Sequence, residues 1–199
     1  MGVDFFGFEE NKMFEVIDGY YGGYNEPWWG KAHMARGILH SFNTLGEGVD
    51  VLRALLGRLG KNPGIKPPFY CEEGKYTLIG DNFTAEPNVI FLDGDVIEVG
   101  DNVYCGSNVV LAASAHGIHP DDRRGIKTAP IHIGSNVIIG AGSVICKGVT
   151  IGDNVTVLPG SIVKKDIPSG TTVGGKPAKS HIGTADNAAD NNSNIYYIR

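Results

Sequence analysis

The chain has 199 residues, 42% of them hydrophobic, and a formal net charge of −5. This length is enough for one substantial core, and no apolar run is long enough to span a bilayer, so we expect no membrane segment. Lys and Arg form no stripe of the kind that binds nucleic acid. Three widely spaced cysteines, with no secretory signal pattern before them, predict reduced thiols and a cytoplasmic location.

The first part of the chain, residues 1–62, reads as a helical segment. The stretch NEPWWGKAHMARGILHSFN has Asn25 as an N-cap candidate and Pro27 in the first turn, where the missing N–H of proline does no harm. The stretch GVDVLRALLGRLG, at 48–60, predicts a second, short amphipathic helix. We therefore expect two helices before the rest of the fold begins.

Residues 63–183 contain an internal repeat of six residues. Apolar residues recur at this spacing in three runs: Ile79, Ala85 and Phe91; Val99, Cys105 and Leu111; Ile133, Ile139, Ile145, Ile151, Val157 and Val163. Three positions after most of them stands a residue type that accepts a left-handed backbone at low cost. These residues are Asn82, Asn88, Gly94, Asn102, Asn108, Asn136, Gly142, Gly148, Asn154, Gly160 and Asp166.

A period of six with turn residues at one phase is typical of the hexapeptide parallel β-helix, in which three hexads form one coil. Short strands turn their aliphatic side chains inward, and the Asn or Gly absorbs each bend. An amphipathic helix would need a period of about 3.6 and would not accommodate Gly or Asn in every turn. A β-sandwich would show longer strands at roughly 8–12-residue spacing. The sequence therefore predicts a mainly β fold, a β-helix preceded by a helical segment.

The six-residue spacing fails at two places. From Phe91 to Val99 the spacing is eight, an insertion of two residues at the corner 93–95. From Leu111 to Ile133 it is twenty-two, and residues 117–130 are predicted to loop out of the coil. After residue 183 the polar stretch 184–199 is expected to form a poorly ordered tail.

The longer interruption holds the first candidate for chemistry. A β-helix has a packed interior, so its function must lie on faces, loops or subunit contacts. The stretch SAHGIHPDDRRG, at 114–125, carries His116 and His119, and histidine accepts a proton near neutral pH. A solvated turn is the alternative, because Pro-Asp-Asp is ordinary turn chemistry. A metal site of these two residues with His132 is the weaker interpretation, since no Cys or carboxylate stands at recognisable ligand spacing, and we expect no metal.

The stretch IHIGSNVIIGAGSVICKGVTIGDNVTVLPGSIVKKDIPSGTTVGGKPAK, at 131–179, resembles the hexapeptide-repeat sugar O-acetyltransferases, the maltose and galactoside acetyltransferase group. The pattern IGDN-x5-GSIV-x-KDIP followed by G-x-P-A is specific for coenzyme A-dependent members, and the likeness extends over about residues 11–183. The resemblance implies a left-handed β-helix, an exception to the usual right-handed crossover. It also implies acetyl-CoA as co-substrate and a homotrimer with active sites between adjacent subunits.

The resemblance assigns the catalytic role to His116. The histidine of the family stands in an H-P-x-D-P-x-x-R-like stretch, and residues 116–123 match it in length, with Gly117 for the first proline and His119 for the aspartate. It implies direct transfer, in which His116 removes the proton from an acceptor hydroxyl as the oxygen attacks the thioester. Such general-base assistance contributes about 10²–10⁴-fold in rate.

For coenzyme A, the resemblance implies an edge of the β-helix near the C-terminal coils. The matching positions are Ala141, Pro159, Lys164, Lys165 and Lys179. The backbone at Ala141 would lie near the oxyanion, and the lysines would meet the nucleotide phosphates. A solvated surface is the alternative interpretation for each lysine.

Several acceptor-side positions depart from the family pattern. They are Gly22 for a sugar-binding aspartate, Glu72 for a serine or aspartate, Glu86 for an asparagine beside the thioester, Gly94 for an aspartate, and Ile138 for a tryptophan. Asp93 flanks the Gly94 position. We expect Glu72, Glu86 and Asp93 to bind a small-molecule acceptor that differs from the acceptors of the family, unless the altered positions mark a lost activity.

Four functions are therefore weighed. The first is a coenzyme A-dependent O-acetyltransferase acting on a hydroxyl of a sugar or other small molecule. The second is an N-acetyltransferase on an amino sugar or small amine, because the same base and donor site serve an amine. The third, a non-catalytic trimeric β-helix protein, is opposed by the retained His116. The fourth is a metal-dependent β-helix enzyme such as a γ-type carbonic anhydrase, which needs the pattern H-x4-H, whereas His116 and His119 are spaced differently.

Overall fold

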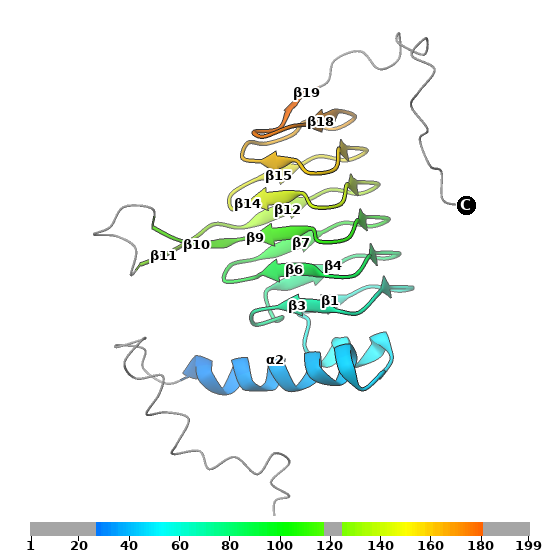
Figure 1. Cartoon of the computed structure of the whole chain (residues 1–199), viewed down its shortest axis with the longest axis vertical. Helices are drawn as coiled ribbons and strands as arrows, with labels where there is room; N and C mark the ends of the chain where they lie inside the picture. Colours follow the sequence, from blue (N-terminus) through cyan, green and yellow to red (C-terminus); the bar gives the residue numbers. More distant parts are fainter. Residues whose placement is uncertain (1–26, 118–124, 181–199) are drawn as a thin grey trace, which may run out of the picture.

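The computed structural model describes residues 27–117 and 125–180, and side chains from residue 35 onward within these ranges. The chain winds into five stacked coils that each pass through three parallel sheets, and helix α2 (Pro27–Thr44) lies across the N-terminal end of the stack (Figure 1). The prediction of a mainly β fold, a parallel β-helix preceded by a helical segment, is confirmed. Among the described residues no helix is long and apolar enough to cross a membrane.

The three sheets, named A, B and C in the order in which each coil visits them, are built from short strands. Sheet A contains β1 (Arg58–Leu59), β4 (Thr77–Ile79), β7 (Ile97–Val99), β12 (Ile131–Ile133) and β15 (Thr150–Ile151). Sheet B contains β2 (Gly64–Ile65), β5 (Thr84–Ala85), β8 (Tyr104–Cys105), β13 (Ile138–Ile139), β16 (Thr156–Val157), β18 (Thr172–Gly174) and the antiparallel β19 (Lys179–Ser180). Sheet C contains β3 (Phe69–Cys71), β6 (Val89–Leu92), β9 (Val110–Ala112), β14 (Val144–Cys146) and β17 (Ile162–Val163).

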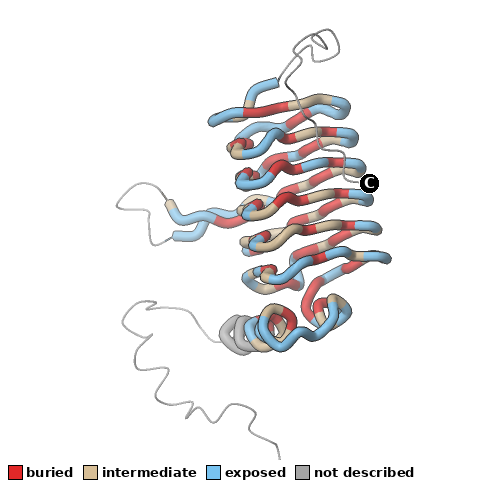
Figure 2. Tube along the Cα trace, turned by 45° about the vertical axis from the view of Figure 1, so that its right-hand side comes forward, coloured by how far each residue is buried: buried red, intermediate tan, exposed pale blue. Residues whose placement is uncertain are grey.

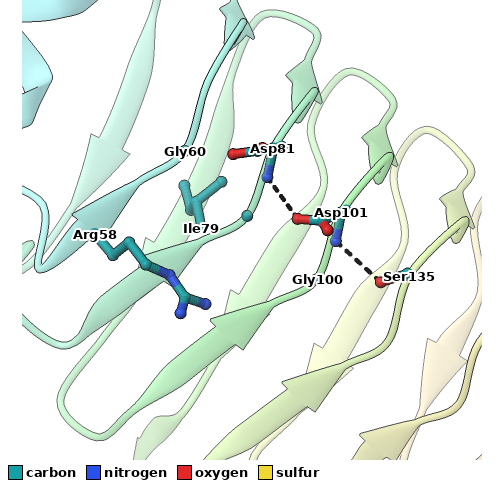
Figure 3. Close-up of a pocket in the computed structure, with 8 residues that line it drawn as sticks. Arg58, Gly60, Ile79, Asp81, Gly100, Asp101 and Ser135 are labelled. Carbon is teal, nitrogen blue, oxygen red and sulfur yellow. Dashed lines mark hydrogen bonds between the residues drawn. The ribbon is translucent and has the colours of Figure 1, made fainter.

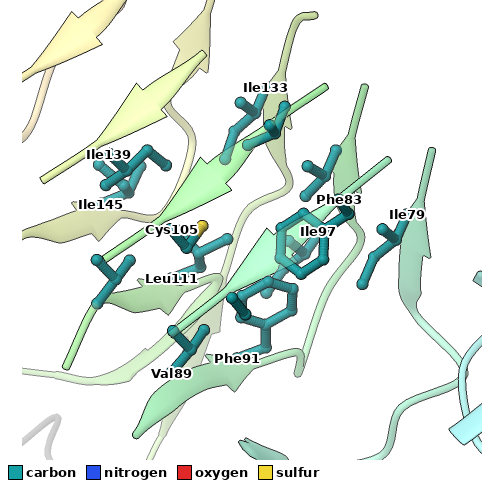
Figure 4. Close-up of a cluster of buried hydrophobic side chains, with 14 of the residues drawn as sticks. Ile79, Phe83, Val89, Phe91, Ile97, Cys105, Leu111, Ile133, Ile139 and Ile145 are labelled. Carbon is teal, nitrogen blue, oxygen red and sulfur yellow. The ribbon is translucent and has the colours of Figure 1, made fainter. Parts of the chain in front are cut away.

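The core fills the inside of the coils. Every apolar residue of the six-residue repeat, from Ile79 to Val163, is at most 3% exposed, as the alternation of side chains along a strand requires. The lower coils also hold three phenylalanines. The Phe91 ring packs edge-to-face on Phe83, with ring centroids 6.2 Å apart (Figure 4). It also packs edge-to-face on Phe69, with ring centroids 5.3 Å apart. A lower coil advances 20 residues and an upper coil 18, so the larger side chains go with the longer coils.

The corners between sheets A and B are held by a ladder of asparagines. Asn62, Asn82, Asn102, Asn136 and Asn154 have φ between 52° and 58°, and the side-chain amide of each of the first four donates to the asparagine of the next coil over 2.9–3.3 Å. A left-handed backbone was predicted at eleven positions, and it is wrong for two of them, Gly94 and Asp166. Both lie at the corner between sheets C and A, where Asp166 instead accepts a hydrogen bond from the backbone N–H of Thr150.

The N-terminal segment differs from its prediction. Helix α2 is present, but the second predicted helix is only a short 3₁₀ helix, η1 (Val49–Ala54), and Arg58 already belongs to β1. The boundary predicted at residue 62 is therefore wrong, because the first coil begins by Arg58. Two glycines explain why: a Cβ on Gly57 or Gly60 would lie within 2.3 Å of a carbonyl oxygen of the next coil, so both allow the chain to stack closely on that coil. Residues 1–26, with Gly22 and Asn25, lie outside the described residues.

Helix α2 closes the N-terminal end of the core. Ala35, Leu39 and Phe42 are buried in the same hydrophobic cluster as the coil residues. The side chain of Asn43 donates from Nδ2 to the carbonyl of Phe69 over 2.8 Å and accepts from the N–H of Phe69 over 2.9 Å. Because β3 is the first strand of its sheet, this amide takes the place of the missing neighbouring strand.

A hairpin leaves the third coil and projects away from the stack (Figures 1 and 2). Strand β10 (Ser114–His116) pairs antiparallel with β11 (Ile126–Thr128), so that His116 is opposite Ile126. The excursion was predicted to begin at residue 117, and this is wrong: after Ala113, whose N–H still bonds the carbonyl of Leu92, the backbone pairs within the hairpin instead of with the coil below. Residues 118–124, with His119, lie outside the described residues, as do residues 181–199 and the predicted tail.

Candidate active site

The site residues predicted from the sequence lie on two edges of the β-helix. We call the stack of corners between sheets B and C the BC edge, and the stack between sheets C and A the CA edge. The BC edge carries Glu86, Ala141 and Pro159, whereas the CA edge carries Glu72, Asp93, His116, Lys164 and Lys165. Lys179 begins β19 at the C-terminal end of sheet B. Within one chain, sheet C therefore separates residues that the family resemblance assigns to one site.

His116 is the last residue of β10, on the hairpin rather than on the coil. The imidazole is exposed in the single chain, and the facing side chain on β11, Ile126, is 50% exposed. The predicted loop bounds, 117–130, left His116 on the coil, and its pairing with Ile126 in the hairpin corrects this. No sequence pattern predicted β10, because Ser, Ala and His have no common strand preference.

Three side chains from three successive coils meet on the CA edge, below the hairpin. The Oγ of Ser114 donates to Oε2 of Glu72 over 3.1 Å, although these residues are two coils apart. Asp93 lies in the coil between them and is fully buried. Its Oδ1 accepts the N–H groups of Glu72 and Glu73 over 2.8 and 3.0 Å, and its Oδ2 accepts the hydroxyl of Thr77 over 3.2 Å. A carboxylate held in this way does not face solvent, which differs from the acceptor-binding role that we predicted for it.

The carboxyl of Glu72 has an unusual electrostatic environment. Burial raises its pKa above the ordinary glutamate value, and the negative charges of Asp93 and Glu73 add to the increase, against hydrogen bonds from Ser114 and the backbone of Gly94. The neighbouring Cys71 thiol also has a raised pKa, through burial and the negative charges of Asp93 and Glu72, which keeps it protonated. The CA edge is therefore a place where negative charge is disfavoured.

The BC edge has a charged lower part and a smooth upper part. Glu86 forms an ion pair with Lys66 of the coil below, with Nζ 2.7 and 2.9 Å from its two carboxylate oxygens. Above Glu86 in the same column stand Gly106 and Gly140, where a Cβ would lie only 2.6 and 2.5 Å from the backbone nitrogens of Ala141 and Pro159. Both glycines are buried and allow the coils to stack closely, so the exposed surface beside them is a narrow strip that contains Ala141 and Pro159.

Comparison with known proteins places this architecture in a family. Residues 130–165 match the model of the bacterial transferase hexapeptide family (six repeats). The solved maltose O-acetyltransferase from Clostridium difficile 630 is 37% identical with a TM-score of 0.75, over 78% of this chain and 87% of that protein. The chain belongs to the hexapeptide-repeat acetyltransferases.

Two further solved members of the family hold coenzyme A or its acetyl ester. A hexapeptide-repeat acetyltransferase from Vibrio cholerae O1 biovar eltor, complexed with acetyl coenzyme A, is 34% identical over 77% of this chain and 86% of its own, with a TM-score of 0.74. A galactoside acetyltransferase in complex with coenzyme A is 29% identical over 94% of this chain and 98% of its own, with a TM-score of 0.78. This hexapeptide-repeat acetyltransferase is accordingly a left-handed β-helix that depends on acetyl-CoA, as the family resemblance implied.

The three lysines predicted for coenzyme A are all exposed. Lys164 and Lys165 follow β17 on the CA edge of the last complete coil, whereas Lys179 begins β19, after β18 at the end of sheet B. Polyanionic phosphates bind where several lysines extend from one surface, because each ammonium group is a mobile point charge. Their role stays a prediction.

Sheet C presents an apolar outer face that sequence reasoning missed. Its outward side chains stand in register across the five strands: Tyr70, Ile90, Val110, Val144 and Ile162, with Leu92, Ala112 and Cys146 beside them. The matching face of sheet A carries Arg58, Leu78, Glu98, His132 and Thr150. A usable signal was present, because the sheet C strands lack the apolar–polar alternation of a strand with one solvated face. We call this surface the apolar face of sheet C.

A surface pocket of about 390 Å³ lies elsewhere, at the corners between sheets A and B (Figure 3). Arg58, Asp81, Asp101 and Ser135 line it, and the two aspartates are part of the corner hydrogen bonds, with Asp81 N–H bonding Asp101 and Asp101 N–H bonding Ser135. It contains none of the predicted site residues. Among the described residues no three His, Cys, Asp or Glu side chains gather to hold a metal, and His132 bonds Glu98 on sheet A, away from the hairpin.

Proposed function

We propose that this chain is an O-acetyltransferase that moves the acetyl group of acetyl-CoA to a hydroxyl of a sugar or another small polyhydroxy molecule, with His116 as general base. The observation that carries the proposal is the position of His116 on an exposed hairpin that extends beyond the coils. A base at this position reaches two substrates that both approach from outside the packed body.

The reaction is a direct transfer. His116 takes the proton of the acceptor hydroxyl as its oxygen forms a bond to the thioester carbonyl carbon, and negative charge develops on the carbonyl oxygen. When the C–S bond breaks, the imidazolium returns the proton to the thiolate, so that the acetyl ester and free coenzyme A leave and the histidine is neutral again. Proton transfer of this kind contributes about 10²–10⁴-fold in rate, and holding the two substrates together contributes the proximity term.

The BC edge supplies a suitable path for the donor. The strip of Ala141 and Pro159, here called the donor strip, is exposed and has no long side chains, so the thin pantetheine arm of coenzyme A can lie against it. Lys179 lies at the C-terminal end of sheet B, where the nucleotide phosphates would bind, and Lys164 and Lys165, on the CA edge, would reach these phosphates from the neighbouring subunit. The backbone N–H of Ala141, on the exposed rim of this strip, is the candidate donor to the developing oxyanion.

The same separation of edges supports assembly into a homotrimer. The apolar face of sheet C lies between the BC edge and the CA edge, and an exposed apolar face of this kind marks an interface. If that face packs against the neighbouring copy, the BC edge of one subunit comes to the CA edge and the hairpin of the next. The donor strip and His116 would then complete each site from two chains.

A thiol-release assay with acetyl-CoA tests the base. We expect His116→Ala to lower turnover by about 10²–10⁴-fold while the trimer and coenzyme A binding remain. The matched control is His132→Ala, which removes a second exposed imidazole, bonded to Glu98 on sheet A. Full activity of His116→Ala would refute the assignment.

The acceptor is found with the same assay over sugars, amino sugars and small amines. The carboxylate of Glu86 is already paired with Lys66, so we expect no strong selection for a cationic acceptor and favour a hydroxyl. Turnover restricted to amines would convert the proposal to an N-acetyltransferase, and no turnover with any acceptor would favour a binding protein.

The trimer is tested by light scattering on Ile162→Asp, which puts a charge on the apolar face of sheet C. We expect monomers, with activity lost in parallel. Thr150→Asp, on the exposed face of sheet A in the same coil, is the control and should remain trimeric. A trimeric Ile162→Asp variant would show that another face forms the interface.

A further inference from the structure

The contact between Glu72 and Ser114 depends on the glycine between them. The two side chains come from the first and third coils, and the second coil contributes Gly94 at that position. A Cβ on Gly94 would lie 2.8 Å from the Cβ of Ser114 and 3.5 Å from Oε2 of Glu72. The missing side chain thus leaves the space through which the carboxylate of Glu72 reaches Ser114.

The backbone from which Glu72 projects is fixed. The buried Asp93 accepts the N–H groups of both Glu72 and Glu73, and the hydroxyl of Thr77 holds its other oxygen. A carboxylate with three such partners fixes the turn after β3 relative to the coil above. Glu72 therefore extends from a rigid base rather than from a loose loop.

Ser114 occupies the point where the hairpin leaves the coil. The residue before it, Ala113, makes the last ladder bond to the coil below, and Ser114 is the first residue of β10. Its side chain is 9% exposed. Alternate residues of a strand point to the same side, so Ser114 and His116 share one face of the hairpin.

We propose that Glu72 is a positioning residue for acetyl transfer: through Ser114 it fixes the direction in which the hairpin leaves the coil, and thereby the place of His116. This inference rests on the proposed role of His116 as the base. It differs from the acceptor-binding role that the sequence indicated for Glu72, because the carboxylate acts on the hairpin and not on the substrate.

Kinetics of four variants test the inference. We expect Glu72→Ala and Ser114→Ala each to lower kcat about tenfold, since a displaced base loses proximity, with the KM values for acetyl-CoA and acceptor within about twofold of the unmodified enzyme. The double variant should be no slower than either single variant, because both remove one contact. Glu73→Gln, the neighbouring carboxylate that pairs with Lys75, is the matched control and should retain kcat.

Two conservative variants separate reach from charge. Glu72→Gln keeps an oxygen at the same distance from Ser114, so we expect it to retain most of kcat. Glu72→Asp keeps the charge but withdraws it by one methylene, so we expect it to behave as Glu72→Ala. The variants Glu72→Gln and Glu72→Asp still test the inference if Glu72→Ala fails to fold. Three results would each overturn the inference. The first is a raised acceptor KM with unchanged kcat in Glu72→Ala, and the second is a loss of kcat in the double variant equal to the product of the two single losses. The third is an active Glu72→Asp variant together with an inactive Glu72→Gln variant.

The failure of this inference can be distinguished from failure of the proposed function. His116→Ala is measured in the same assay. If it is inactive while Glu72→Ala and Ser114→Ala match the unmodified enzyme, only the positioning role is refuted. If His116→Ala is fully active, the base itself is wrong and the positioning role falls with it.

Discussion

Removal of the Asn43 side chain tests how helix α2 is attached to the β-helix. In Asn43→Ala, the N–H and the carbonyl of Phe69 both lose their partner. Phe69 is fully buried, so little water can replace the lost amide. Each orphaned backbone group costs about 1–3 kcal/mol, so the pair together costs about 2–6 kcal/mol.

Thermal unfolding followed by circular dichroism measures this loss. For a chain of this size, 1 kcal/mol corresponds to roughly 2–4 °C in Tm, so we expect Asn43→Ala to lower Tm by about 4–24 °C. The protomer concentration must be the same in all samples, because assembly shifts apparent stability. His40→Ala, an exposed residue on the same helix, is the control and should change Tm by less than about 2 °C.

Asn43→Asp separates the two hydrogen bonds. It keeps an acceptor for the N–H of Phe69 but turns an oxygen toward the Phe69 carbonyl, so we expect a loss at least as large as for Asn43→Ala at pH 7. If Asn43→Ala melted within about 2 °C of His40→Ala, the reasoning that the amide replaces a missing strand would be refuted.

Three further outcomes follow from the edges and the core. Burial raises the folded-state pKa of Glu72, so the stability that this carboxyl contributes is present below its unfolded-state pKa and is lost as the pH rises. Glu72→Gln should therefore raise Tm at pH 7. When Tm is measured at a series of pH values, the difference from the unmodified protein should shrink toward pH 4. Gly106→Ala should lower stability by about 1–3 kcal/mol and raise the KM for acetyl-CoA, because its Cβ would meet the backbone of Ala141 at 2.6 Å; Gly64→Ala, with no atom nearer than 3.5 Å, should do neither. Phe91→Ala should cost about 3–5 kcal/mol in urea unfolding, because it empties the centre of the lower core, and a loss below about 1 kcal/mol would contradict the packing.

The repeat could be read from the sequence because its cause is local. An inward position recurs every six residues, so a residue at that position, such as Ile139, must be apolar. The corner position needs a left-handed backbone, so it is occupied by a residue such as Asn102. Each requirement is imposed on one residue by its own coil. The choice of His116 from the family resemblance is likewise a statement about one position, and its role stays a prediction.

The contacts between coils were not predicted. Glu72 and Ser114 are 42 residues apart, and their meeting depends on coil length and on the absence of a side chain at Gly94. The start of the hairpin at Ser114 depends on which strand its backbone groups pair with, β11 or the next coil. A pattern within one stretch of the sequence does not show which of these two strand pairings forms.

The sequence alone determined the coil, its inward residues and most of its corners, because periodicity is repeated in every hexad and each repeat confirms the others. Only the tertiary structure decided which residues share an edge, that Glu86 forms an ion pair with Lys66, and that sheet C lies between the donor strip and His116. The physical reason is that a six-residue period is the same on all three edges. The edge on which a side chain lies depends on how the coils stack, including the two-residue insertions in the longer coils and the one hairpin.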